Sequence, residues 1–208
     1  MSIQVGPESS VRNRTRGAIL AAAASVLARD RTATLSDIAE ASGVGRTTLH
    51  RYFPDRESLI EAAVKDSIQA IQESVAEAVL DQGSPLDAMR RAVAAMVAVG
   101  DRLMFVFGDP RVLEGYGAGG GAAPPDDPVI DLIRRGQAEG VFDPEVSASW
   151  IQHVLWVLVY RGCEDADSGE LPRHGVTATV IRTLENGIHA RLSTADRSKA
   201  RKEFTGLN

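Results

Sequence analysis

The 208 residues include 23 basic and 28 acidic side chains, a net charge of −5, and 44% hydrophobic residues, which is enough for a core. The single cysteine, Cys163, excludes an internal disulfide framework and suits a reducing cytoplasm. No stretch has the pattern of a signal peptide or the roughly 20 apolar residues of a membrane span, so we expect a cytoplasmic protein without membrane contact.

The charge is distributed unevenly along the chain. Residues 1–56 hold eight arginines and five acidic residues, a net charge of +3, so the remainder carries −8. A basic N-terminal part favours contact with phosphates, although a difference of this size is common in ordinary proteins. The distribution therefore supports a nucleic-acid partner only together with other signals.

Residues 11–29 predict a first helix, because alanine and leucine recur at helical spacing and no glycine or proline follows Gly17. Arg12, Arg14 and Arg16 lie at its beginning. They could contact a DNA backbone there, and a solvated helix end explains them equally well.

Residues 34–56 predict two short helices joined by a tight turn. Thr34 and Asp37 have the spacing of a capping box, which marks the start of the first helix. Gly43 supplies the positive φ that ends this helix. Pro54 ends the second helix, and Asp55 caps the helix that follows.

In the second of these helices, residues 46–52, one apolar residue, Leu49, faces inward. Arginine reads guanine edges, threonine contacts thymine methyls or phosphates, and tyrosine and arginine reach phosphate oxygens. A helical hairpin with a solvated polar face is the simpler reading, but the caps, the turn and the buried positions together favour a helix-turn-helix. The residues that we expect to contact DNA are Arg46, Thr47, Thr48, His50, Arg51, Tyr52 and Arg56.

Further helices follow in the body of the chain. We expect them over residues 57–80, 85–99, 101–107, 129–139, 144–161 and 174–192, with loops at 108–128 and 165–172. Ser84 and Pro85 mark one start, Gly140 marks one end, and Val79 is expected to face inward. No stretch alternates with period two, so the predicted fold class is all-α.

The chain has no recognisable catalytic motif. The histidines at positions 50, 153, 174 and 189 lack metal-ligand spacing, and Cys163 has no activating base beside it. The glycine-rich tract at 115–121 is not followed by Gly-Lys-Ser/Thr, so it is no phosphate loop. We therefore expect no enzyme activity, no cofactor and no metal. A helical enzyme and an architectural DNA-binding protein remain alternatives, which a gel shift would separate from a site-specific regulator.

Residues 34–60 resemble the DNA-binding domain of TetR-family transcriptional regulators. The resemblance is carried by Thr34, Ile38-Ala39, Gly43-Val44, Thr48-Leu49, Tyr52-Phe53 and Arg56-Glu57-Ser58-Leu59. The sequence departs from the family at Gly45, where serine is common, at His50, where tyrosine is common, and at Arg56, which replaces lysine. These departures concern the operator sequence rather than the fold.

The resemblance implies about nine helices in two parts, a helix-turn-helix DNA-binding domain at 1–56 and a ligand-binding and dimerisation domain at 57–208. It implies a regulator, expected to be a repressor, that binds a near-palindromic double-stranded DNA operator and is released by a small-molecule effector. Arg46, Thr47 and His50 would read bases, while Thr48, Tyr52 and Arg56 would hold phosphates.

The resemblance also implies a homodimer built by the two C-terminal helices. The helix at 144–161 is apolar on more than one side, and the last helix has an apolar stripe, Val176, Val180, Leu184 and Ile188. An effector pocket is expected in the body, although each candidate could instead be a core residue. The candidates are Met104, Phe105, Phe107, Tyr116, Trp150, His153, Trp156 and Tyr160.

Overall fold

The computed structural model describes residues 7–108 and 127–188, and the described part is built of helices without any strand. The predicted all-α class is therefore confirmed. None of the described helices combines the length and the hydrophobicity that a membrane crossing requires. The helices are α1 (Pro7–Arg29), α2 (Leu35–Ala41), α3 (Arg46–Tyr52), α4 (Arg56–Glu77), α5 (Pro85–Ala98), α6 (Gly100–Phe107), α8 (Pro128–Ala138), α9 (Ala148–Ser168) and α10 (Val176–Ile188), with a short 3-10 helix, η1, at Arg173–Gly175.

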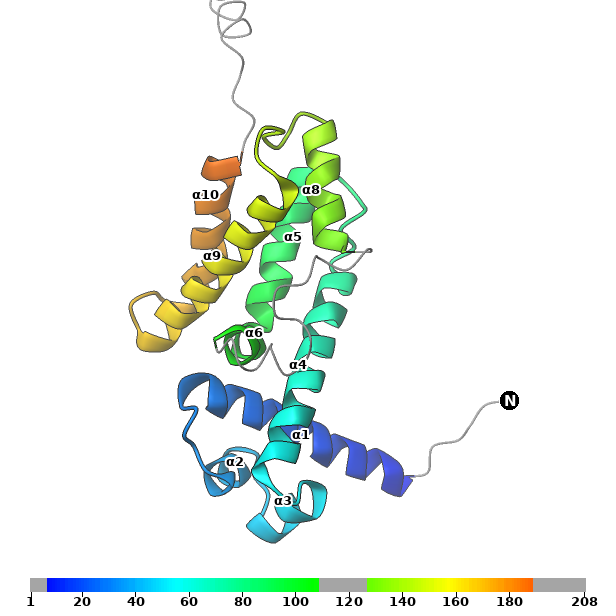
Figure 1. Cartoon of the computed structure of the whole chain (residues 1–208), viewed down its shortest axis with the longest axis vertical. Helices are drawn as coiled ribbons and strands as arrows, with labels where there is room; N and C mark the ends of the chain where they lie inside the picture. The colour runs from blue at the N-terminus through cyan, green and yellow to red at the C-terminus, as the bar shows by residue number, and fades with distance from the viewer. Residues whose placement is uncertain (1–6, 109–126, 189–208) are drawn as a thin grey trace, which may run out of the picture.

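The molecule is elongated, with α1, α2 and α3 at one end and α8, α9 and α10 toward the other (Figure 1). We call the end formed by α1–α3 and the first half of α4 the head, and the remainder the body. The long helix α4 runs from the head into the body, and α6 lies between the two parts beside α1. Head and body are thus connected by two helices rather than by a flexible linker.

Two clusters of buried side chains form the cores. The head cluster gathers apolar residues of α1, α2, α3 and the first half of α4. The short helix α6 belongs to both clusters, because Phe105 and Val106 are buried in the head while Leu103 and Met104 are buried in the body. Any change in the position of α6 therefore disturbs both cores.

Local sequence signals determine most helix boundaries. The Thr34 hydroxyl accepts a hydrogen bond from the Asp37 N–H at 3.3 Å, and the Asp37 carboxylate accepts one from the Thr34 N–H at 2.7 Å. This is the predicted capping box. Gly43 and Gly140 have φ values of +69° and +71°, so both end helices as expected.

The end of α4 differs from the prediction. The helix stops at Glu77, and Val79 is 41% exposed with a φ of +48° instead of facing inward. Two arginines hold the carbonyl groups of this turn: Arg91 donates to Ala78 and Val79 at 2.8 and 2.9 Å, and Arg135 donates to Leu80 at 2.9 Å. These bonds replace those that a longer helix would have made.

The boundaries of α9 also differ from the prediction. The helix begins at Ala148, four residues late, and continues to Ser168 through the first part of the predicted loop at 165–172. Arg161 pairs with Glu164 at 2.8 Å and with Asp165 at 2.7 Å, and this spacing supports continued helix. Gly169, with a φ of +84°, then ends it.

The apolar stripe of the last helix is covered by its own body, while the homodimer built by the two C-terminal helices stays a prediction. Val176, Val180, Leu184 and Ile188 are each at most 4% exposed, because they face the core of their own body. Gly162 of α9 allows this close approach, since a Cβ there would lie 3.1 Å from side-chain atoms of Val176 and Val180. Any partner of α10 must contact its opposite face.

Gly136 is a position where a single methyl group should destabilise the body. A Cβ at this residue of α8 would collide with the fully buried ring of Phe142, whose N–H donates to the Gly136 carbonyl at 3.0 Å. We expect Gly136→Ala to cost about 1–3 kcal/mol, because the ring cannot retreat within a packed core. Chemical denaturation measures this loss.

Gly17→Ala is the matched control, because Gly17 is also helical and nothing lies within 4 Å of its would-be Cβ. We expect it to be neutral or to stabilise by up to about 1 kcal/mol through helix propensity. Equal losses in both variants would show that close packing at Gly136 is not the cause.

Candidate functional site

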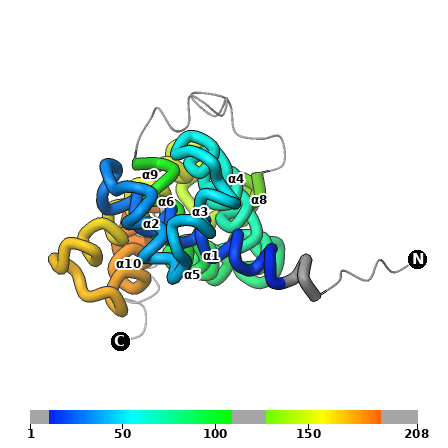
Figure 2. The backbone as a smooth tube through the Cα atoms, turned by 90° about the horizontal axis from the view of Figure 1, so that it is seen from below, coloured from blue at the N-terminus to red at the C-terminus, as the bar shows by residue number. Residues whose placement is uncertain are grey.

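The polar face of α3 is exposed at the tip of the head. Leu49 is fully buried in the head cluster, while Arg46, Thr47, His50 and Arg51 are exposed, and Thr48 and Tyr52 are half-buried on the flanks. Figure 2, viewed from below, shows α2 and α3 in front of the body helices. One buried anchor thus turns the predicted base-reading residues toward solvent, in an orientation that suits a major groove.

Neighbouring contacts hold the aromatic and basic residues around α3. The Arg16 guanidinium of α1 lies 5.5 Å from the centre of the buried Phe53 ring, directly after α3. The Arg51 guanidinium lies 5.8 Å from the centre of the Tyr52 ring. A cation–π contact of this kind orients a guanidinium over a ring face without using its N–H groups.

Arg56 has partners that the sequence analysis did not anticipate. Its guanidinium donates hydrogen bonds to the carbonyl groups of Ala33 and, at 2.7 Å, of Arg31. It therefore ties the start of α4 to the loop between α1 and α2. A phosphate contact by Arg56 remains a prediction, and it would have to use the other N–H groups of this side chain.

Two carboxylates in the head, those of Asp37 and Asp55, take part in helix N-caps. The backbone and side chain of Thr34 hydrogen-bond to Asp37 and lower its pKa, and those of Ser58 do the same for Asp55. Both aspartates therefore stay ionised to a lower pH than an ordinary aspartate does. The stabilisation that they provide is present above their ordinary pKa values and is lost as the pH falls through the lowered ones.

Three of the predicted effector-binding residues come together in the body. Phe107 and Trp156 pack with ring centres 4.9 Å apart and planes at 52°, and Tyr160 follows one turn after Trp156 on α9. With neighbouring side chains they line a groove of about 380 Å³, which we call the aromatic groove. Its lining residues are Leu103, Phe107, Trp156, Val157, Tyr160 and Arg161.

The sequence analysis missed three of these lining residues. Leu103 lies one turn before Phe107 on α6, and Val157 and Arg161 follow Trp156 and Tyr160 directly on α9. Helical spacing from Phe107 would have found Leu103. No local sequence pattern predicts that α6 packs against α9.

The other predicted effector-binding residues lie elsewhere. Phe105 is buried in the head cluster, so it does not fit the prediction of a body pocket. Met104 belongs to the body core, and Trp150 and His153 are exposed on α9, with Trp150 61% exposed. Tyr116 and the tract at 115–121 lie outside the described residues.

The part of the chain that the structure describes contains no group of three or more His, Cys, Asp or Glu side chains that could hold a metal. Cys163 is buried, and its burial raises the pKa of the thiol to about 11. Its sulfur packs tightly against Gly100, since a Cβ there would lie 2.6 Å away. A packed, protonated thiol is a poor nucleophile.

Comparison of the sequence with known proteins identifies a matching family and two relatives. The family model of the bacterial regulatory proteins of the tetR family matches residues 19–63. The HTH-type transcriptional repressor LfrR of Mycolicibacterium smegmatis is 35% identical over 182 residues, which cover 87% of this chain and 94% of LfrR. The HTH-type transcriptional regulator NfxB of Pseudomonas aeruginosa is 28% identical over 151 residues, 72% of this chain and 80% of NfxB.

A solved structure of LfrR from Mycobacterium smegmatis, in complex with proflavine, is similar over most of its length. It superposes with a TM-score of 0.70 at 33% identity, and the match covers 86% of this chain and 98% of that one. The similarity therefore includes the body as well as the head.

Proposed function

Since this chain belongs to the TetR family of bacterial transcriptional regulators, we propose that it represses transcription as a homodimer bound to a near-palindromic operator and is released by a small-molecule effector. The observation that carries the proposal is the exposed polar face of α3, held by the buried Leu49 at the tip of a head with net positive charge. The family's members are regulators, which points away from an enzyme.

We assign DNA binding to residues 1–56 and effector binding with dimerisation to residues 57–208. Base reading falls to Arg46, Thr47 and His50, which are exposed on one side of α3. Leu59, Ala63 and Val64 of α4 are buried in the head core, so the head moves together with α4. We therefore expect α4 to transmit the effect of effector binding in the body to the DNA-binding head.

Selection of bound DNA from a random pool tests the DNA-binding part of the proposal. We expect one enriched, nearly palindromic sequence, bound with an affinity that falls steeply as salt rises. Enrichment of no sequence, with salt-dependent binding of all DNA, would favour the architectural alternative. Absence of DNA binding would favour the helical enzyme.

The exposed side of α9 supports the homodimer. Trp150 and Val157 are 61% and 65% exposed, and His153 lies between them at helical spacing on the same side. Large apolar side chains on one exposed helix face are typical of a protein–protein interface. Since α9 and α10 lie side by side at one flank of the body, a second copy could pack on both (Figure 1).

The aromatic groove supports a flat, apolar effector. Its volume of about 380 Å³ lies within the range of small-molecule sites, and Phe107, Trp156 and Tyr160 offer ring faces. Arg161 at the edge is paired with Glu164, Asp165 and Glu170 at 2.8, 2.7 and 3.7 Å, so this edge is acidic overall. We therefore propose an aromatic cation, the chemical class of the proflavine that LfrR binds.

Trp156→Ala should weaken proflavine binding, because it removes one ring of the aromatic groove. An aromatic contact contributes about 0.5–1.5 kcal/mol in addition to the free energy of burying its surface. We therefore expect the proflavine Kd to rise about two- to tenfold or more. Fluorescence titration measures the affinity, and wild-type operator binding should weaken over the same proflavine range.

Trp150→Ala provides the control, because Trp150 lies outside the groove, and light scattering first checks that this variant is as dimeric as the wild type, since Trp150 belongs to the proposed interface. It should leave the proflavine Kd unchanged. If both tryptophan variants bound proflavine like the wild type, the effector site would lie elsewhere in the body. If proflavine bound without changing operator affinity, the groove would not be the switch.

A further inference from the structure

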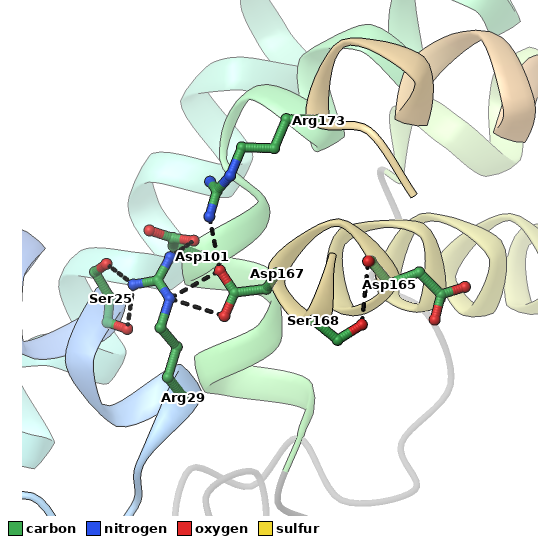
Figure 3. A network of polar contacts seen from close by, with 7 residues as sticks. All are labelled: Ser25, Arg29, Asp101, Asp165, Asp167, Ser168 and Arg173. Atoms are coloured by element: carbon green, nitrogen blue, oxygen red, sulfur yellow. Dashed lines mark hydrogen bonds and ion pairs between the residues drawn. The ribbon is translucent and has the colours of Figure 1, made fainter. Parts of the chain in front are cut away.

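A polar network joins the head to the body at the end of α1. Arg29, in the last turn of α1, donates from Nε to the two carboxylate oxygens of Asp167 at 2.9 and 2.8 Å. Its Nη2 donates to Asp101 of α6 at 3.1 Å. Figure 3 shows this guanidinium between the two carboxylates. One head residue thus contacts two body helices, α6 near its beginning and α9 near its end.

Further hydrogen bonds orient Arg29 within the head and Asp167 within the body. Nη1 of Arg29 donates to the Ser25 carbonyl at 2.9 Å, one turn earlier on α1. Arg173 of η1 donates to Asp167 at 2.8 Å, so this carboxylate serves arginines from the head and from the body (Figure 3). The Asp167 side chain is only 22% exposed, which limits the screening of both pairs by water.

Apolar packing is incomplete at this junction. A cleft of about 380 Å³ opens beside the network, between α1, the turn from α5 to α6, and the end of α9. Its apolar walls include Ala21, Val97, Met104 and Ala166. The end of α1 contacts the body through Ala28, which packs against the body core, and through the Arg29–Asp167 pair, which joins α1 directly to α9.

The neighbouring residue of α6 is bound to the other head helix. Arg102 pairs with Asp66 of α4 at 2.5 Å, and its side chain is 20% exposed. Adjacent residues of α6, Asp101 and Arg102, thus connect to α1 and to α4 with opposite charges. A rotation of the head about α6 would strain both pairs, in addition to the buried contacts of Phe105 and Val106.

We propose that Arg29, Asp101 and Asp167 form a clasp that fixes the orientation of the DNA-binding head relative to α9. These are positioning residues, since they lie away from the exposed face of α3. Their effect on operator affinity rests on the proposed function, whereas their effect on head orientation does not. Because the clasp consists of partly exposed ion pairs, salt weakens it, and a modest force from the body can open it.

The test measures head orientation directly, by pulsed electron paramagnetic resonance between two spin labels on one chain. The labels are attached to cysteines that replace Glu40 on α2 and Glu139 beside α8, both of which are exposed. The native Cys163 is buried and protonated at neutral pH, so it should resist labelling. Diluting labelled with unlabelled protein keeps the measured distance within one chain.

Arg29→Gln and Asp167→Asn should each broaden or shift the distance distribution, and Arg29→Lys should restore it in part by keeping the charge. Arg90→Gln is the matched control, since Arg90 pairs with Glu185 at 2.6 Å within the body. It should leave the distribution as in the wild type. Operator affinity in the clasp variants should fall about two- to fivefold, the range of an exposed ion pair, equally for all operator variants.

A distribution that Arg29→Gln leaves unchanged would overturn the clasp, and so would equal broadening in Arg90→Gln. If the wild type bound no operator, the proposed function would fail, while the distances would still decide whether the clasp exists.

Discussion

Replacing Val157 with glutamate is expected to convert the dimer into a monomer and to weaken operator binding by about 100-fold or more. Val157 is 65% exposed on the side of α9 where a second copy is proposed to pack. A carboxylate there would be buried without a partner, which strongly opposes association. Two linked heads bind two half-sites with an avidity about 10²–10⁴ above that of one head, and a monomer loses this gain.

Light scattering measures the first effect, because each chain has a mass of 22.2 kDa. Val79→Glu is the matched control, since Val79 is also exposed but lies in the turn after α4. It should leave the dimer and the operator affinity unchanged. A wild type that is monomeric at working concentration, or a Val157→Glu variant that stays dimeric, would contradict an interface on this side of α9.

Arg46→Ala is expected to cost roughly 1–3 kcal/mol of operator binding, about five- to 150-fold in Kd, and to relax the preference at one base pair. Arg46 is the first residue of α3 and is exposed, and its positive charge helps to lower the pKa of the nearby Asp37 without a hydrogen bond to it. Its guanidinium is therefore available for the two acceptors of a guanine edge. Binding titrations on operators that differ at single positions measure both effects.

Arg56→Ala should behave differently and so serves as the comparison. Removing its guanidinium leaves the carbonyl groups of Arg31 and Ala33 without this donor, at a cost of about 1–3 kcal/mol in head stability. All operators should then bind more weakly, with the base preference unchanged. Thermal unfolding separates this loss from a lost DNA contact. Identical behaviour of the two variants across operators would refute the distinct role of Arg46.

The sequence by itself determined where most helices begin and end. The side chains of Thr34, Asp55 and Ser84 each accept an N–H of the turn that follows, the Asp37 carboxylate accepts the Thr34 N–H, and Gly43 and Gly140 adopt positive φ. These effects act over three or four residues, so the local pattern specifies them. The inward Leu49 and the exposed face of α3 follow from helical spacing in the same way.

Only the tertiary structure decided which surfaces meet. An apolar stripe indicates that Val176 and its neighbours are buried, but not that their own body rather than a second copy buries them. Phe105 joins the head and Phe107 the aromatic groove, because α6 presents one face to each core. Arg29 and Asp167 are separated by 138 positions, and such a charge pair has no local pattern. The packing of α1, α6 and α9 brings them together.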